Sequence, residues 1–153
     1  MLFRSPFAPS VLREHAREWF ELDEDSPYMA IVAPILERRR RALSAAEENK
    51  TGIESLGVVR SEIPAVTHVD YSARIQTVDA VTHPLYHQLL EAFKSKTGCP
   101  MLVNTSFNVR GEPIVCTPED AFRCFMGTGL DMLAIGRCIL RKDQQDQIGR
   151  AHV

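Results

Sequence analysis

The segment Asn104 to Pro113 concentrates polar side chains that could contact an oxygen-rich ligand. It follows a short apolar run, and its alternate side chains would point the same way if the chain is extended. Asn104, Ser106 and Asn108 would then form one row able to donate to and accept from phosphate or carbonyl oxygens. Arg110 adds a planar guanidinium suited to phosphate. The alternative is a loop held by its own Asn side chains.

Arg74 and Gln76 form a second candidate group. The segment Ala73–Val78 alternates in a way that predicts a strand, with Arg74 and Gln76 on the face opposite Ile75. An arginine in such a strand must either face water or find a partner. A plain exposed face is the alternative explanation. Arg4 is a third candidate cation, near a chain end, where chains are usually loose.

Two further groups have simpler explanations. His68 and Asp70 could act as a proton-shuttling pair, but a strand-end histidine beside a turn-forming aspartate is the preferred interpretation. Cys116 has no neighbouring cation in the sequence that would lower its pKa, which argues against a nucleophile. The four cysteines show no metal-ligand spacing, so we expect reduced thiols and no protein-bound metal.

The elements that must position the polar segment are predicted from its surroundings. A buried strand over 101–103 leads into it. Before that strand, a helix over 84–96 has Leu85, Leu89, Leu90 and Phe93 on its inward face, and Gly98 ends it. After the segment, the sequence predicts a helix from the Thr117 cap through Phe125, and strands over 131–135 and 138–140.

The first half of the chain has weaker signals. We predict a helix over 11–20 capped by Ser10, and strands over 28–32 and 63–69. A helix over 35–49 and a loop over 50–62 would form a surface excursion. Within it, the run Arg38 to Arg41 has acidic neighbours and is interpreted as a solvated helix face, with an anion or RNA patch as the alternative.

These elements predict the fold class. Helices and strands alternate, but some successive strands are too close for a crossover helix. The expected fold is therefore α/β (α+β): a single domain over 1–141 with a mixed twisted sheet flanked by helices, followed by a polar tail over 142–153 that frays. The chain has 153 residues and a net charge of −2, which argues against nucleic-acid binding. No apolar run reaches the roughly 18–20 residues needed to span a bilayer.

A family resemblance is carried by several motifs in the same order along residues 3–141. Together they resemble the C-terminal region of NodU/CmcH-type carbamoyltransferases. The motifs are Pro6–Ser10, Ser26–Met29, Thr67–Asp70, Ala73–Val78, Asn104–Asn108, Gly111–Ile114 and Thr117–Ala121.

The resemblance implies a YrdC-like, cytoplasmic domain that converts ATP and carbamoyl phosphate into carbamoyl-adenylate, with Mg²⁺ accompanying the nucleotide. An N-terminal Kae-like domain, not in this chain, would pass the carbamoyl group to a hydroxyl acceptor. Arg74 and Ser106 would be the catalytic residues. The substrate- and nucleotide-binding residues it implies are Arg4, Arg74, Gln76, Asn104, Ser106, Asn108 and Arg110.

A second hypothesis differs in class from this partial enzyme. Basic residues that the family carries upstream of Arg4 are not in this chain. The chain could therefore be a folded non-catalytic fragment, or a nucleotide-binding module without turnover. A third hypothesis, RNA binding, is disfavoured by the net charge of −2.

Overall fold

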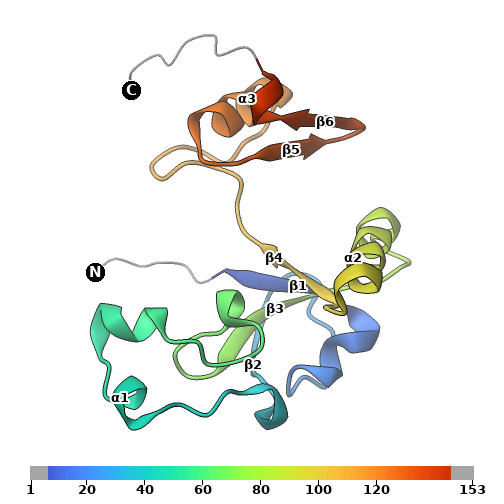
Figure 1. Cartoon of the computed structure of the whole chain (residues 1–153). Coiled ribbons are helices and arrows are strands. Elements are labelled where there is room, and N and C mark those ends of the chain that lie inside the picture. Colours follow the sequence, from blue (N-terminus) through green and yellow to red (C-terminus); the bar gives the residue numbers. More distant parts are fainter. Residues whose placement is uncertain (1–6, 146–153) are drawn as a thin grey trace. The chain divides into compact units, whose positions relative to one another are not determined.

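The computed structural model describes residues 7–145 and divides the chain into two compact units. The first unit ends at Thr105 and the second begins at Ser106. The first contains a four-stranded sheet, and the second contains a helix with a two-stranded hairpin (Figure 1). The predicted class, a mixed α/β sheet with helices, is confirmed.

The sheet of the first unit is mixed, with strand order β2-β3-β1-β4. Its central pair is parallel, and both outer pairs are antiparallel. Two registers matter for the site: Ser10 is opposite Gln76 in the central pair, and Ala8 is opposite Asn104 in the β1–β4 pair. The strands are β1 (Ala8–Leu12), β2 (Ile31–Pro34), β3 (Ser72–Val78) and β4 (Met101–Asn104).

Strand β1 corrects the prediction of a helix over 11–20 capped by Ser10. The helical part is only the 3₁₀ segment Arg13–Glu18, whereas Ser10 is fully buried in the strand. Pro9 explains the error, because proline cannot donate to a ladder and rarely occurs in a central strand. Pro9 nevertheless lies opposite Val103 between two partner strands.

The two faces of the sheet are covered differently. One face carries a large apolar cluster that includes Val11, Ile75, Trp19 and Phe20. On the opposite face, Leu12 and Val78 pack against helix α2 (Pro84–Thr97) through its fully buried Leu90. Ser10, Arg74 and Gln76 lie on this same face of the sheet as Leu12 and Val78, because alternate side chains of a strand point to the same side.

Helix α2 has the predicted limits and ends at Gly98, which adopts the left-handed conformation (φ 76°). The predicted inward face was wrong in part. Leu90 is buried, but Leu85 is 80% exposed and Leu89 is 54% exposed. The helix therefore contacts the sheet along a narrower stripe than its leucine pattern predicted.

The excursion over 35–62 is not a helix followed by a loop. It contains the 3₁₀ turn Glu37–Arg39, the single-turn helix α1 (Ala45–Glu48) and the 3₁₀ segment Gly52–Gly57. The arginine run is not a solvated helix face either, because each guanidinium donates to a backbone carbonyl. The bonds of Arg38 and Arg39 tie the excursion to the 3₁₀ segment Arg13–Glu18, whereas those of Arg40 and Arg41 close the excursion on itself. The acceptors are Glu18 for Arg38 and Arg39, Ile35 for Arg40 and Val59 for Arg41.

Two predicted strands were also misplaced. The strand expected over 28–32 lies at Ile31–Pro34, since Met29 has a positive φ of 56° and belongs to a turn. The strand expected over 63–69 is replaced by the 3₁₀ turn Pro64–Val66. Pro64 has no N–H for a ladder, and its fixed φ suits the first turn of a helix.

The second unit is built on helix α3 (Pro118–Gly127) and the hairpin β5 (Met132–Ile135) with β6 (Cys138–Arg141), as predicted. Thr117 caps α3 and exchanges hydrogen bonds with Asp120 in a capping box. Phe125 is fully buried and packs against Ala121 and Leu133. Of the predicted tail, the described part is the 3₁₀ turn Lys142–Gln144.

Candidate functional site

A hydrogen-bonded cluster around Gln76 lies on the face of the first unit's sheet that α2 covers only in part. The Gln76 Oε1 atom accepts from Ser10 Oγ and from Asn104 Nδ2, each at 2.6 Å. Its Nε2 atom donates to the Pro27 carbonyl at 3.2 Å. Three strands and one loop therefore meet at a single amide. The structure thus brings together two predicted site residues, Gln76 and Asn104.

Arg74 lies two residues before Gln76 on the same strand and face, opposite Val32 of β2. The predicted alternation of β3 is confirmed, because Ala73 and Ile75 are fully buried while Arg74 is exposed. Within residues 7–145, the Arg74 guanidinium has no hydrogen bond and no ion pair. Its five N–H donors are thus free to bind an anion beside the Gln76 cluster.

Sequence reasoning missed two parts of this cluster. Ser10 was predicted to be a helix cap, but its hydroxyl holds Gln76. The loop over 26–29 is held to β3 through Ser26, whose N–H donates to Thr77 Oγ1 at 2.9 Å and whose carbonyl accepts from the Thr77 N–H at 3.0 Å. The Pro9 ring and the positive φ of Met29 hid both features.

The second unit holds the loop that carries Asn108. The Asn108 Nδ2 atom donates to the carbonyls of Val109 and Glu112, both at 3.1 Å. The Val115 N–H closes the loop on the Phe107 carbonyl at 2.9 Å, and Gly111 turns the chain with a φ of 89°. The alternative of a loop held by its own Asn side chains therefore describes Asn108, although its Oδ1 atom keeps an acceptor free.

Ser106 and Arg110 are exposed in the same unit, and neither side chain has a hydrogen bond or ion pair among the described residues. Asn104 belongs to the first unit, whereas Ser106 and Asn108 belong to the second. The predicted common row of these three side chains thus stays a prediction. Arg4 lies outside the described residues.

His68 and Asp70 form a turn, as the simpler interpretation held. Asp70 Oδ1 accepts from the Ser72 hydroxyl at 2.6 Å and from the Ser72 N–H at 3.0 Å. These bonds, with the hydroxyl contributing most, lower the pKa of Asp70. His68 Nδ1 bonds the same hydroxyl at 2.9 Å, so both side chains are occupied in holding the start of β3.

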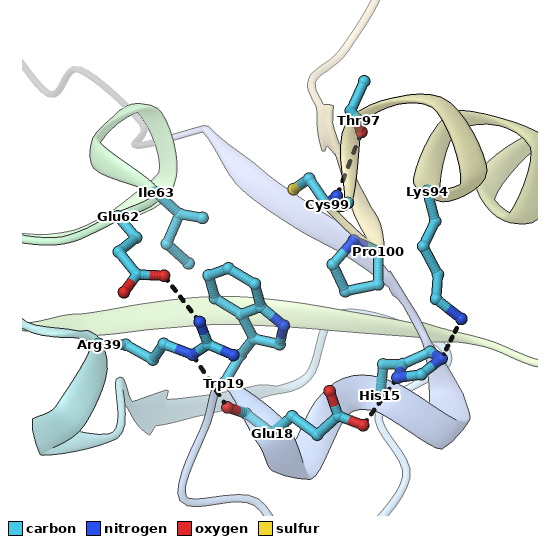
Figure 2. Close-up of a pocket in the computed structure, with 11 residues that line it drawn as sticks. His15, Glu18, Trp19, Arg39, Glu62, Ile63, Lys94, Thr97, Cys99 and Pro100 are labelled. Carbon is cyan, nitrogen blue, oxygen red and sulfur yellow. Dashed lines mark hydrogen bonds and ion pairs between the residues drawn. The ribbon is translucent and has the colours of Figure 1, made fainter.

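A hollow of about 340 Å³ lies on the first unit away from the Gln76 cluster (Figure 2). Its charged side chains are paired with one another. Arg39 stacks over Trp19 at 4.0 Å from the ring centre and pairs with Glu62 at 2.8 Å. His15 lies between Glu18, at 2.8 Å, and Lys94, at 2.5 Å. The hollow contains none of the predicted site residues.

The chemistry available is recognition of an anion. The Gln76 cluster is neutral and fixed by long-range hydrogen bonds, and it places an unpaired guanidinium at its edge. Phosphate or carboxylate oxygens are the groups that such a fork binds, in a bidentate manner. The fold and this group of residues define a small mixed α/β domain whose sheet face presents a neutral hydrogen-bonded cluster beside an exposed arginine.

Comparison with known proteins gives the family. Residues 2–142 match the family model described as carbamoyltransferase C-terminus. The chain belongs to this family, and the resemblance predicted from its motifs is confirmed. The description of this family refers to the C-terminal part of carbamoyltransferases.

Relatives extend the comparison. The chain is 58% identical over 142 residues to an uncharacterized protein of Synechocystis sp., covering 93% of this chain and 23% of that protein. It is 40% identical to the nodulation protein NolNO of Sinorhizobium fredii, covering 90% of the chain and 18% of the relative. It is 34% identical to the 3'-hydroxymethylcephem-O-carbamoyltransferase of Amycolatopsis lactamdurans, covering 86% and 21%. The chain thus spans about a fifth of the length of these relatives.

None of the helices within residues 7–145 combines the length and the apolar character that crossing a bilayer requires.

Proposed function

We propose that this chain is the activation domain of an O-carbamoyltransferase, which binds ATP and carbamoyl phosphate and forms carbamoyl-adenylate. The observation that carries the proposal is the Arg74 guanidinium, which is unpaired among residues 7–145 and lies beside the Gln76 cluster. The members of that cluster, Ser10, Gln76 and Asn104, are all uncharged. Family membership supports it, since the matched family is described as the C-terminus of carbamoyltransferases. The relative from Amycolatopsis lactamdurans is named as an O-carbamoyltransferase.

The proposed reaction needs stabilisation of charge. Carbamoyl phosphate loses its phosphate to water and leaves carbamate. A carbamate oxygen then attacks the α-phosphorus of ATP, a new O–P bond forms, and the bond to the bridging oxygen breaks to release pyrophosphate. Negative charge builds on the α-phosphate oxygens, where Arg74 and the Ser106 hydroxyl would donate. Mg²⁺ would accompany the nucleotide phosphates.

The remaining proposed site residues would orient the reactants. Asn104 and Gln76 would fix the sheet face that receives the carbamoyl group. Asn108 would offer its free Oδ1 atom, and Arg110 would add a second cation. The YrdC-like architecture belongs to this proposal, as does transfer to the acceptor by an N-terminal Kae-like domain.

The test is calorimetric titration of the chain with ATP, with and without carbamoyl phosphate and Mg²⁺. Arg74→Ala should abolish measurable binding while leaving the melting temperature nearly unchanged, since the exposed Arg74 side chain makes no hydrogen bond or ion pair within residues 7–145. Arg123→Ala is a matched control, because Arg123 is 77% exposed in the second unit and pairs only with Asp120 within its helix.

Two outcomes would contradict the proposal. The chain could be folded and bind no nucleotide at millimolar concentration, which would favour the fragment without activity of its own. Binding could also survive Arg74→Ala unchanged, which would place the nucleotide elsewhere. If ATP binds but no pyrophosphate is released with carbamoyl phosphate present, the chain is a nucleotide-binding module without turnover.

A further inference from the structure

Three potential metal-ligating side chains converge at the junction of the 3₁₀ segment Arg13–Glu18 and helix α2. Glu14 comes from the 3₁₀ segment, and His87 and Glu91 come from α2. One ligand atom from each lies within 4.8 Å of the other two. His87 Nε2 is 2.8 Å from Glu14 Oε1. None of the three belongs to the candidate carbamoyl-activation site.

The spacing on α2 suits ligation of one ion. Residues four apart in a helix lie one above the other on the same face, so His87 and Glu91 present an imidazole and a carboxylate to the same point. Glu14 approaches from a different element and completes a face of three donors. One imidazole nitrogen with two carboxylate oxygens is a ligand set that Zn²⁺ and related divalent metals accept.

We propose that Glu14, His87 and Glu91 bind a divalent transition-metal cation of the zinc type. The adjustment required is small. Two ligands of a tetrahedral zinc ion are separated by about 3.4 Å, given metal–ligand bonds of roughly 2.0–2.2 Å. His87 Nε2 and Glu14 Oε1 must therefore move apart by about 0.6 Å. The ligand atom of the half-buried Glu91 already lies within 4.8 Å of both, so rotation of its side chain can bring it to the metal.

The surroundings favour a cation. Glu14 and His87 also line a hollow of about 660 Å³, which is rich in carboxylates. Arg13 is already paired with Asp25 at 2.7 Å. A cavity lined mainly by one sign of charge raises the local concentration of counter-ions. The carboxylates that line the hollow are Glu14, Asp23, Glu24, Asp25 and Asp79, and its guanidinium groups are Arg13 and Arg17.

The nearby cation is Lys94, whose Nζ lies 3.5 Å from Glu91 Oε1. Lys94 Nζ also lies 2.5 Å from His15 Nε2, so it retains a partner when Glu91 turns to the metal.

A bound ion would link two segments that border the sheet. The 3₁₀ segment follows β1 directly, and α2 precedes β4. The ion would therefore hold together the ends of the strands that carry Ser10 and Asn104. Its role would be structural, and the proposal stands whether or not the chain binds ATP.

The test is titration of the metal-free chain with Co²⁺, in which the visible absorption bands of the bound ion report binding. One Co²⁺ per chain should bind without a thiolate charge-transfer band, which separates this site from the four cysteines. His87→Gln and Glu91→Gln should each weaken binding roughly tenfold or more, since removing even a supporting partner of a metal site typically costs 10–100-fold. The bound chain should also melt at a higher temperature than the metal-free chain.

His83→Gln provides the matched control, because His83 is an exposed histidine next to the same helix and its side chain makes no hydrogen bond to the cap. The proposal fails if Co²⁺ does not bind at millimolar concentration. It also fails if His83→Gln weakens binding as much as His87→Gln does. Circular dichroism of each variant shows whether it is folded, so that loss of binding is not mistaken for loss of fold. Glu14→Gln removes the one proposed ligand that lies outside helix α2 and should also weaken binding.

Discussion

The two units place polar side chains by different means. In the first unit, Gln76 bonds partners that are 66 and 28 residues away in the sequence, Ser10 and Asn104. In the second unit, Asn108 bonds carbonyls one and four residues away. The geometry of the first group depends on the whole sheet, whereas the loop of the second group is set by local contacts.

The hydrophobic cores of the two units also differ, in how many segments and large side chains form them. The main cluster of the first unit joins segments from Val11 to Met101, including the aromatic rings of Trp19 and Phe20. The second unit's cluster has one large fully buried side chain, Phe125. A sheet buried on one face by many residues tolerates a single loss better than a unit that depends on one ring. Long-range contacts should therefore define the first unit, and a single aromatic anchor the second.

The largest expected effect is at that anchor. Phe125→Ala should destabilise the second unit by about 3–5 kcal/mol, the usual cost of removing a buried aromatic side chain. Hydrogen exchange of peptides from α3, measured by mass spectrometry, would report it as loss of amide protection. Phe122→Ala is the control on the same helix, because Phe122 is 41% exposed. Equal loss of protection in both variants would show that the buried ring is not the anchor.

The next effect tests the long-range cluster. Gln76→Ala leaves the buried Ser10 hydroxyl and the Asn104 amide without their shared acceptor, so the free energy of unfolding should fall by about 2–3 kcal/mol. Urea unfolding followed by fluorescence of the single tryptophan, Trp19, would measure it. Gln88→Ala, on the exposed face of α2, should change stability by less than about 0.5 kcal/mol. Matching shifts for the two glutamines would remove the cluster as a source of stability.

The same comparison explains what the sequence could predict. Elements with strong local signals were correct: the Thr117 cap of α3, the Gly98 end of α2 and the alternation of β3. Each depends on residues within one turn or one strand. The family and the fold class were therefore within reach of the sequence.

Errors occurred where long-range contacts override local preference. Pro9 lies in a central strand although proline disfavours that position, and sheet pairing on both sides outweighs the preference. The arginine run appeared helical, yet its guanidiniums bond carbonyls of distant segments. Leu85 and Leu89 followed a helical apolar pattern without being buried. No local rule reveals which partner a side chain will meet across the fold.

The smallest effect compares, in acid, the turn before helix α2 with the capped start of helix α3. The Thr82 hydroxyl, aided by backbone N–H groups, lowers the pKa of Asp79 from 3.8 to about 2, and Thr117 lowers the pKa of Asp120. A carboxylate with a depressed folded-state pKa contributes stability above its unfolded pKa and loses it as the pH falls through the folded value. The contribution of Asp79 should therefore disappear between about pH 4 and pH 2.

Asp79→Asn isolates this charge, because asparagine keeps the acceptor oxygen but cannot ionise. The variant should melt slightly below the wild type at pH 6, and the difference should close as the pH falls from 3.8 to 2. Asp120→Asn should follow the same direction in the second unit. Melting curves recorded across this range by circular dichroism would measure both. A constant gap between variant and wild type at every pH would mean that the hydrogen-bond geometry matters and the charge does not. Short-range hydrogen bonds of an aspartate would then stabilise both units through their geometry alone.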